Sequence, residues 1–294
     1  MLLDLIKGEN IKYCYMKNGL IQDSNINLKD FSFNKDYKFV LFHEIDNDTE
    51  IEYNLNSGIN VNILEIMDVK NNANIKKVFN ISDNSNLDIV SLETSSDVNT
   101  SINSNSYLGV NAHMDYMKLT IFNGDTVIKD NSYLNNNKGK LNNYAVYINS
   151  MKKNLDIDSV VTHDSLDSES IMTNYAICKD TSKIRINTNG IIKKGAKGTL
   201  VRQKSKGILL DLESQIEANP WLQIDEYDCM ASHGAGIGAI DEEELYYLMS
   251  RGLTKDTSEK LIIGGFVNPV YEHIEEMGFN KLLDFLKEEV DKYL

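Results

Sequence analysis

Three cysteines and one histidine are the side chains in this sequence best suited to hold a metal. Cys14, Cys178 and Cys229 are far apart, odd in number and form no Cys-x-x-Cys pair, so neither a disulfide framework nor a zinc knuckle is expected. Cys229 and His233 are four residues apart in a strand-like stretch, which places them on one face about 13 Å apart. A site that uses both must therefore draw ligands from neighbouring strands or from a second chain.

Cys178 and a second histidine, His163, are also candidate ligands, each with a structural alternative. Cys178 is either a ligand or a small buried hydrophobe. His163, between Thr162 and Asp164, is either a ligand or a hydrogen-bonding residue at a strand edge. The stretch from Gly234 to Ala239 also satisfies the GxGxxA dinucleotide pattern. We reject that interpretation, because no first strand of a βαβ unit precedes it and the four acids that follow it would repel a pyrophosphate.

The elements that must position these residues change character near Asp241. Upstream, short apolar runs alternate with period two, as in Tyr144, Val146 and Ile148, and clusters of Asn, Ser, Asp and Gly separate them. Such alternation predicts strands with one face inward and the other toward solvent, so the body is mainly β. About 35 asparagines and only two prolines favour a solenoid with Asn stacked at its corners. From composition alone an ordinary sandwich stays open.

Downstream of Asp241 the apolar spacing is helical. Asp241 is a predicted N-cap with Glu244 in the capping-box position, and Gly252 is placed to end that helix. Thr254 is the predicted cap of a second helix, and Pro269 is expected to break it. A last amphipathic helix carries its apolar residues at Leu282, Leu283, Phe285, Leu286 and Val290.

Length and charge limit the classes of function. The chain has 294 residues, enough for one large or two ordinary domains. Its net charge of −14 leaves no basic excess to neutralise phosphates, which argues against a nucleic-acid binder and an anionic membrane surface. The first residues lack the pattern of a signal peptide, and no window approaches the ~18 apolar residues of a membrane span. We therefore expect a cytoplasmic protein without membrane or nucleic-acid partners.

A long motif near the C-terminus carries a family resemblance. The stretch 232–253, SHGAGIGAIDEEELYYLMSRGL, followed by LIIGGFVNPV, resembles the C-terminal signature of the SufB/SufD family, core proteins of Suf iron–sulfur cluster assembly. The stretches 168–170, 190–199 and 220–224 are similar to the last rungs of that family. The resemblance covers about residues 160–294 and is closest to the short SufB/SufD-like protein of minimal two-component systems. The cysteine that SufB carries upstream would fall near 203–205, where this chain has none.

The resemblance implies a fold and a set of partners. The fold is a right-handed parallel β-helix followed by an α-helical domain, which divides the chain into an N-terminal cap (1–35), a β-helix core (36–240) and a C-terminal helical domain (241–294). The implied partners are a second copy, paired through β-helix edges, and a SufC-type ABC ATPase that binds the helices. The implied cofactor is a transient iron–sulfur cluster shared between subunits.

The resemblance also assigns roles to particular residues. His233 matches the histidine that SufD keeps at the core interface, so Cys229 and His233 are the expected metal ligands, with Cys178 and His163 as further cluster-binding candidates. Aromatic and arginine side chains are favoured at interfaces. The expected ATPase-binding residues, on or beside the first helix, are Asp241, Glu244, Tyr246, Tyr247 and Arg251.

Two other functions stay open from the sequence. One is a β-helix carbohydrate-active enzyme, which needs a pair of carboxylates about 5–9.5 Å apart or a calcium-assisted site. The other is a structural partner that binds the ATPase and never holds a cluster. The scaffold interpretation expects no catalytic residues and no enzyme activity in this chain.

Overall fold

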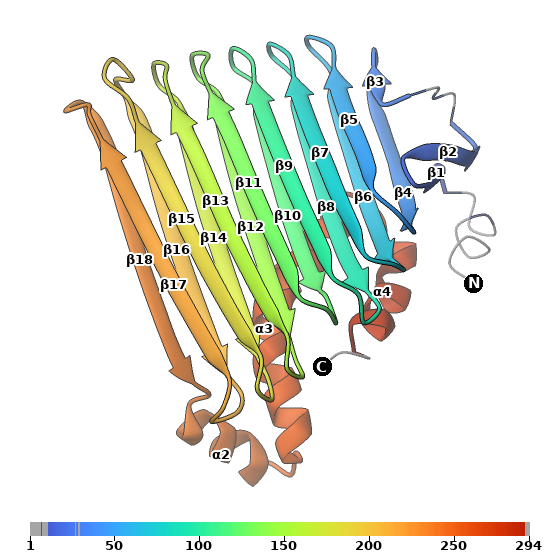
Figure 1. The fold of residues 1–294 in the computed structure, drawn as a ribbon, viewed down its shortest axis with the longest axis vertical. Helices are drawn as coiled ribbons and strands as arrows, with labels where there is room; N and C mark the ends of the chain where they lie inside the picture. Colours follow the sequence, from blue (N-terminus) through green and yellow to red (C-terminus); the bar gives the residue numbers. More distant parts are fainter. Residues whose placement is uncertain (1–6, 8–10, 27, 29, 292–294) are drawn as a thin grey trace.

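The chain folds into a parallel β-solenoid that carries its C-terminal helices along one flank (Figure 1). The computed structural model describes residues 7, 11–26, 28 and 30–291. From β4 onward the chain passes alternately between two sheets and completes about eight turns. The predicted mainly-β fold with C-terminal helices is therefore confirmed.

Neighbouring strands in both sheets run parallel, except in the β1–β2 hairpin at the N-terminal edge. The larger sheet contains β1 (Tyr13–Lys17), β2 (Leu20–Ser24), β4 (Tyr37–Ile45), β6 (Asn60–Val69), β8 (Asn86–Ser95), β10 (His113–Ile121), β12 (Lys140–Asn149), β14 (Glu169–Cys178), β16 (Thr199–Leu209) and β18 (Cys229–Ala239). The smaller sheet contains β3 (Ser32–Phe33), β5 (Thr49–Leu55), β7 (Ala73–Ile81), β9 (Thr100–Leu108), β11 (Thr126–Leu134), β13 (Asn154–His163), β15 (Lys183–Ile192) and β17 (Gln215–Ile224).

The N-terminal hairpin adds two strands to the larger sheet beside β4, and β3 adds a short strand to the smaller sheet beside β5. Residues 1–6, 8–10, 27 and 29 of the predicted cap lie outside the described residues. The division into a cap, a core and a helical domain stays a prediction.

Asparagine shapes the corners between turns, as the composition predicted. Asn84 and Asn111 occupy equivalent corners with left-handed backbones, at φ 58° and 53°. The backbone N–H of Asn84 donates to the carbonyl of Val110 in the next turn at 2.9 Å. Elsewhere Asn86 Nδ2 donates to Asn60 Oδ1, 26 residues earlier in the chain, at 2.6 Å. Asn tolerates the left-handed conformation and has both a donor and an acceptor, so it stacks well from turn to turn.

The helices that follow β18 are α2 (Glu242–Ser250), α3 (Lys255–Glu276), the 3₁₀ turn η1 (Asn280–Leu282) and α4 (Leu283–Asp291). The two predicted N-caps are confirmed: the side chain of Asp241 accepts backbone N–H groups of α2, and that of Thr254 accepts one of α3. Gly252, at φ 97°, follows α2 as predicted.

The predicted break at Pro269 is wrong, because α3 continues through it. Proline removes one helical hydrogen bond at a cost of about 3 kcal/mol. The apolar stripe of α3 runs without interruption past this position, with Ile263, Val267, Val270 and Ile274 all buried. Burial of this stripe offsets the cost of the proline.

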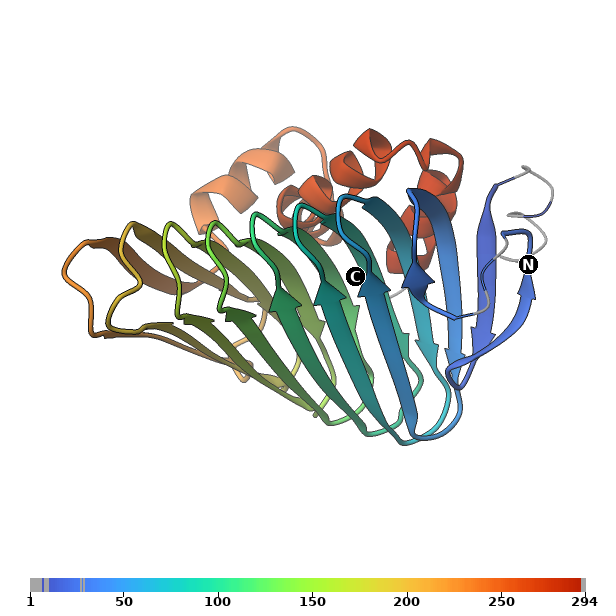
Figure 2. The ribbon, with the colours of Figure 1, turned by 90° about the horizontal axis from the view of Figure 1, so that it is seen from above.

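Both α3 and α4 pack on the outer face of the larger sheet (Figure 2). Val267 of α3 and Leu286 of α4 share one apolar cluster with the strand residues Val90 and Leu119. The hydroxyl of Tyr144 also donates to the backbone carbonyl of Phe266 at 2.9 Å. The larger sheet is therefore covered on both sides over much of its area.

The helices cover the face of β12 that the sequence pattern did not distinguish as buried by helices. Tyr144, Val146 and Ile148 belong to the apolar cluster beneath the helices, on the outer face of the sheet. The residues that alternate with them, among them Asn143 and Tyr147, face the solenoid interior and are buried as well. The prediction that one face of this strand meets solvent is wrong, because helices pack over that face.

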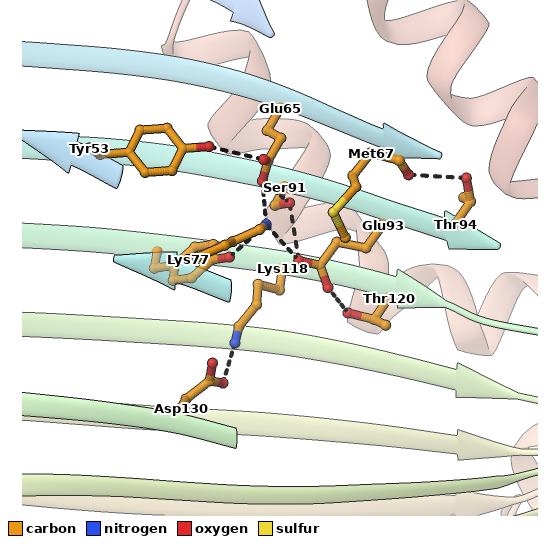
Figure 3. A network of polar contacts seen from close by, with 11 residues as sticks. Tyr53, Glu65, Met67, Lys77, Ser91, Glu93, Thr94, Lys118, Thr120 and Asp130 are labelled. Atoms are coloured by element: carbon orange, nitrogen blue, oxygen red, sulfur yellow. Dashed lines mark hydrogen bonds and ion pairs between the residues drawn. The ribbon is translucent and has the colours of Figure 1, made fainter. Parts of the chain in front are cut away.

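The interior of the N-terminal half contains buried charges (Figure 3). Lys77 Nζ lies 2.7 Å from Glu65 Oε2 and 3.2 Å from Glu93 Oε1, and all three side chains are buried. Tyr53 donates its hydroxyl to Glu65 Oε1 at 3.1 Å. Burial by itself would raise the pKa of Glu65, but the ammonium of Lys77 lowers it below its ordinary value. Each charge in this cluster therefore has a partner of opposite sign.

A second buried ion pair, between Lys118 and Asp130, lies further along the interior (Figure 3). Neither set of buried charges follows from the period-two pattern of apolar residues. A signal was present: Lys77 alternates with Ile75 and Phe79, at positions that face the interior. A charged residue at such a position needs a partner from a neighbouring strand.

We predict that Lys77→Met destabilises the fold by about 3–5 kcal/mol, because it leaves two buried carboxylates without a counter-ion. The matched control is Lys76→Met, at the next residue, where Lys76 pairs with Glu50 on the surface. Urea unfolding should show a large drop in midpoint for the first variant and little change for the second. Similar midpoints for the two variants would contradict the structural importance of the buried network.

Candidate functional site

Cys229 and His233 lie on β18, the last strand of the larger sheet. In the described part of the chain β18 has a paired neighbour, β16, on one side only. The register places Cys229 beside Thr199 and His233 beside Gln203. Thr199 and Gln203 face the interior, so Cys229 and His233 face the same side of the sheet. No further turn covers them there, and His233 is exposed.

The surroundings of Cys229 keep its thiol protonated at neutral pH. The side chain is half-buried and lies against the small apolar cluster of Ile192, Ala196 and Val201. Its Sγ donates to the backbone carbonyl of Glu226 at 3.2 Å. Burial raises the pKa of the thiol, and the nearby carboxylates raise it further. Because a metal binds the thiolate, a bound cation would favour loss of this proton.

His163 lies inside the solenoid and has both ring nitrogens engaged. Nδ1 lies 2.7 Å from Ser168 Oγ, and Nε2 lies 2.8 Å from Ser170 Oγ. Burial lowers the pKa of His163 to about 4, so the ring is neutral. Ser168 Oγ in turn lies 3.2 Å from Thr199 Oγ1, and Thr199 is the strand neighbour of Cys229. Hydrogen bonds therefore extend from His163 toward Cys229, although His163 has no free nitrogen for a metal.

Cys178 lies apart from this site. It is the last residue of β14 and pairs with Leu209, which pairs with Ala239 at the far end of β18 from Cys229. Its Sγ lies 3.1 Å from the carbonyl and 3.0 Å from the hydroxyl of Ser182. Burial raises the pKa of this thiol. The structure thus does not bring Cys178 together with Cys229 and His233.

The five residues expected to contact a partner gather on α2. Asp241 caps the helix, and Arg251 ends it with its guanidinium 5.1 Å from the ring centre of Tyr247. Tyr246 is 75% exposed and Tyr247 is 55% exposed. No residue of α2 is buried. This helix therefore offers an acidic and aromatic surface that the rest of the described chain leaves uncovered.

The carbohydrate-enzyme alternative requires a pair of free carboxylates. Asp125 and Asp156 both line an open groove of about 540 Å³ on the flank of the solenoid. Asp125 Oδ1 accepts from the backbone N–H and the side-chain amide of Asn154, at 2.9 and 3.0 Å. Asp156 Oδ1 pairs with Nε of Arg185 at 3.0 Å. Both acids therefore make contacts between turns, so neither carboxylate is free.

No group of three or more His, Cys, Asp or Glu side chains is arranged to hold a metal ion within residues 7, 11–26, 28 and 30–291. Over the same residues no helix is long and apolar enough to cross a membrane.

The fold and the site together define a class. The protein is a parallel β-solenoid with helices packed on one sheet, and its candidate ligands lie on the last strand, which in the described chain is paired along one edge only. Residues 49–266 match the family model described as "SUF system FeS cluster assembly, SufBD core domain". The chain belongs to this family, whose members are components of iron–sulfur cluster assembly.

Curated relatives agree with the family model. The chain is 30% identical over 190 residues to the iron–sulfur cluster assembly protein SufD of Bacillus subtilis. The aligned residues make up 64% of this chain and 44% of the relative. It is 40% identical over 87 residues to an iron–sulfur cluster assembly SufBD family protein of Pyrococcus horikoshii. That alignment takes in 30% of this chain and 20% of the relative. This chain therefore spans less than half the length of these two relatives.

Selective alkylation checks the contrast among the three cysteines. We predict that iodoacetamide labels Cys229 in the native protein, with a rate that rises as the pH is raised toward its elevated pKa. Cys14, whose pKa burial raises to about 11, and Cys178 should react only after unfolding. Mass spectrometry of native and urea-treated samples measures this difference. Equal protection of Cys229 and Cys178 would show that the last turn is covered.

Proposed function

We propose that this chain is a scaffold subunit of iron–sulfur cluster assembly. A second copy pairs with it through β18, a nascent cluster is held as cargo at the paired ends, and a SufC-type ABC ATPase binds α2. The chain itself catalyses no reaction in this proposal. The observation that carries it is the position of Cys229 and His233 on an edge strand with one paired side, within the segment that matches the SufBD core model.

The proposed pairing rests on the character of β18. An edge strand has unpaired backbone groups that favour a further strand. The outer face of β18 carries Gly234, Gly236 and Gly238, and a Cβ added at any of these would meet no atom of this chain within 4 Å. Three alternate glycines weaken a strand without relieving any contact in the monomer. Glycines at these positions would allow a second chain to approach the backbone of β18 closely.

The proposed cluster ligation follows from the pairing. One chain offers Cys229 and His233 about 13 Å apart along the strand, too far for one metal ion. If two β18 strands pair antiparallel around a two-fold axis, four such ligands come into one region. A cluster with mixed thiolate and imidazole ligands would be less firmly held than one with four thiolates, which suits a scaffold that must release it.

The proposed ATPase contact rests on α2. Its tyrosines are exposed while α3 and α4 use their apolar faces against the sheet. Interfaces favour tyrosine and arginine. A structural partner that never holds a cluster would use the same surface, so binding and cluster loading need separate experiments.

Anaerobic reconstitution with ferrous iron and sulfide, in the presence of the ATPase, tests the site. We predict that Cys229→Ser and His233→Ala each reduce bound iron and charge-transfer absorbance at least several-fold without changing the dimer. The matched controls are Cys14→Ala and His113→Ala, which should load as the parent does. If both site variants load fully, the cluster does not lie at β18.

The ATPase contact is tested by pull-down of the purified ATPase. We predict that the double variant Tyr246→Ala, Tyr247→Ala loses at least tenfold in affinity. The control is Tyr107→Ala, Tyr133→Ala, which removes a stacked pair on the other sheet, with ring centres 5.1 Å apart. Removal of all the helices would be a poor test, because it would expose the apolar face of the larger sheet. Equal binding by the two double variants would place the ATPase elsewhere.

A further inference from the structure

Buried polar atoms without a partner concentrate in the C-terminal half of the solenoid interior. In the N-terminal half the buried charges satisfy one another, and His43 Nδ1 and Thr100 Oγ1 are the unpartnered atoms there among the described residues. From β11 to β16 many more interior atoms have no partner. They are Asp130 Oδ1, Asn143 Oδ1, Tyr147 OH, Ser159 Oγ, Asn174 Oδ1, Thr188 Oγ1, Ser205 Oγ and both amide atoms of Gln203.

The side chains that carry these atoms are at most 9% exposed. Several of them stack in rows along the solenoid axis. In the smaller sheet Asp130 pairs with Ser159, and Ser159 pairs with Thr188. In the larger sheet Asn174 pairs with Ser205. Stacked short side chains can bond directly, as Ser168 Oγ and Thr199 Oγ1 do at 3.2 Å, but the atoms named in these rows make no such bond. Adjacent strands lie about 4.8 Å apart, which is close enough for one water to bridge two members of a row.

The two ends of this region differ. At the inner end, Asp130 Oδ2 pairs with Lys118 while its Oδ1 has no partner. The buried network there has three carboxylates, on Glu65, Glu93 and Asp130, against the two ammonium groups of Lys77 and Lys118. At the outer end, Gln203 lies beside the exposed His233 of the last strand. One end of the interior of β11–β16 therefore lies beside an excess negative charge at Asp130, and the other end lies beside solvent at His233.

A buried hydroxyl or amide left without a hydrogen bond costs about 1–3 kcal/mol. Nine such atoms in one region would consume most of the stability of a typical domain. Buried water removes this cost where a site offers two or more polar partners. Lys118 faces the inner end of this region from β10. From the described strands β11–β17 no lysine or arginine faces the interior, which favours a neutral ligand over an anion.

We propose that the interior of β11–β16 binds a file of water molecules that runs from Asp130 to the last turn at His233. These waters bridge successive members of the polar rows and solvate the free oxygen of Asp130. They connect the buried ion pairs to solvent through the end of the solenoid that carries the candidate site. The proposal does not depend on cluster binding or on the ATPase.

The isosteric substitution Thr188→Val separates a wet interior from a dry one. In a wet interior it removes a partner of a bound water, so the urea midpoint falls. In a dry interior it removes an unsatisfied hydroxyl, so the midpoint rises. The matched control is Thr126→Val, since Thr126 is equally buried and donates to the carbonyl of Gly124 at 3.1 Å. This control should lower the midpoint in either case.

A crystal structure of the full-length parent at a resolution that shows ordered solvent gives a second measurement, which also serves if Thr188→Val fails to fold. We expect water within 3.5 Å of Thr188 Oγ1, Ser159 Oγ and Asn174 Oδ1. The proposal is overturned if these atoms contact only protein, or if the midpoint of Thr188→Val is unchanged or raised.

Discussion

The rest of the structure depends on one constraint, the in-register stacking of parallel strands from turn to turn. Each side chain lies directly beside its counterpart in the next turn, about 4.8 Å away. A polar residue inside the solenoid must therefore find its partner in an adjacent turn or in the facing sheet. Lys77 of the smaller sheet meets this requirement with Glu65 and Glu93 of the larger sheet. The same constraint lets the corner asparagines Asn111 and Asn84 bond to one another between turns.

Stacking also explains why the candidate site lies at an end. A strand within the solenoid has both of its edges paired, whereas in the described chain β18 has one paired edge. At the opposite end β1 lies beside β4 and pairs with it in parallel. The outermost strand, β2, pairs antiparallel with β1. The two ends are thus chemically different. The family match, residues 49–266, includes the β18 end and does not reach the β1–β2 hairpin.

Two of the helices belong to the packed core, whereas α2 lies on the surface. The buried stripe of α3 and the apolar face of α4 cover the larger sheet, so these helices are part of the core. By contrast α2 buries no residue and lies next to the end of β18. A partner bound to α2 would be close to the last turn without disturbing the packed helices.

The sequence by itself determined the features that depend on local chemistry. Period-two alternation gave the strands, the side chains of Asp241 and Thr254 gave the caps, and the motif around His233 gave the family. Tertiary structure decided which face of a strand is inside, since the face with Tyr144 and Val146 is buried only because helices cover it. It also decided that α3 passes through Pro269 and that Lys77 lies among carboxylates. Each of these outcomes is set by contacts between residues distant in the chain, which a local pattern does not contain.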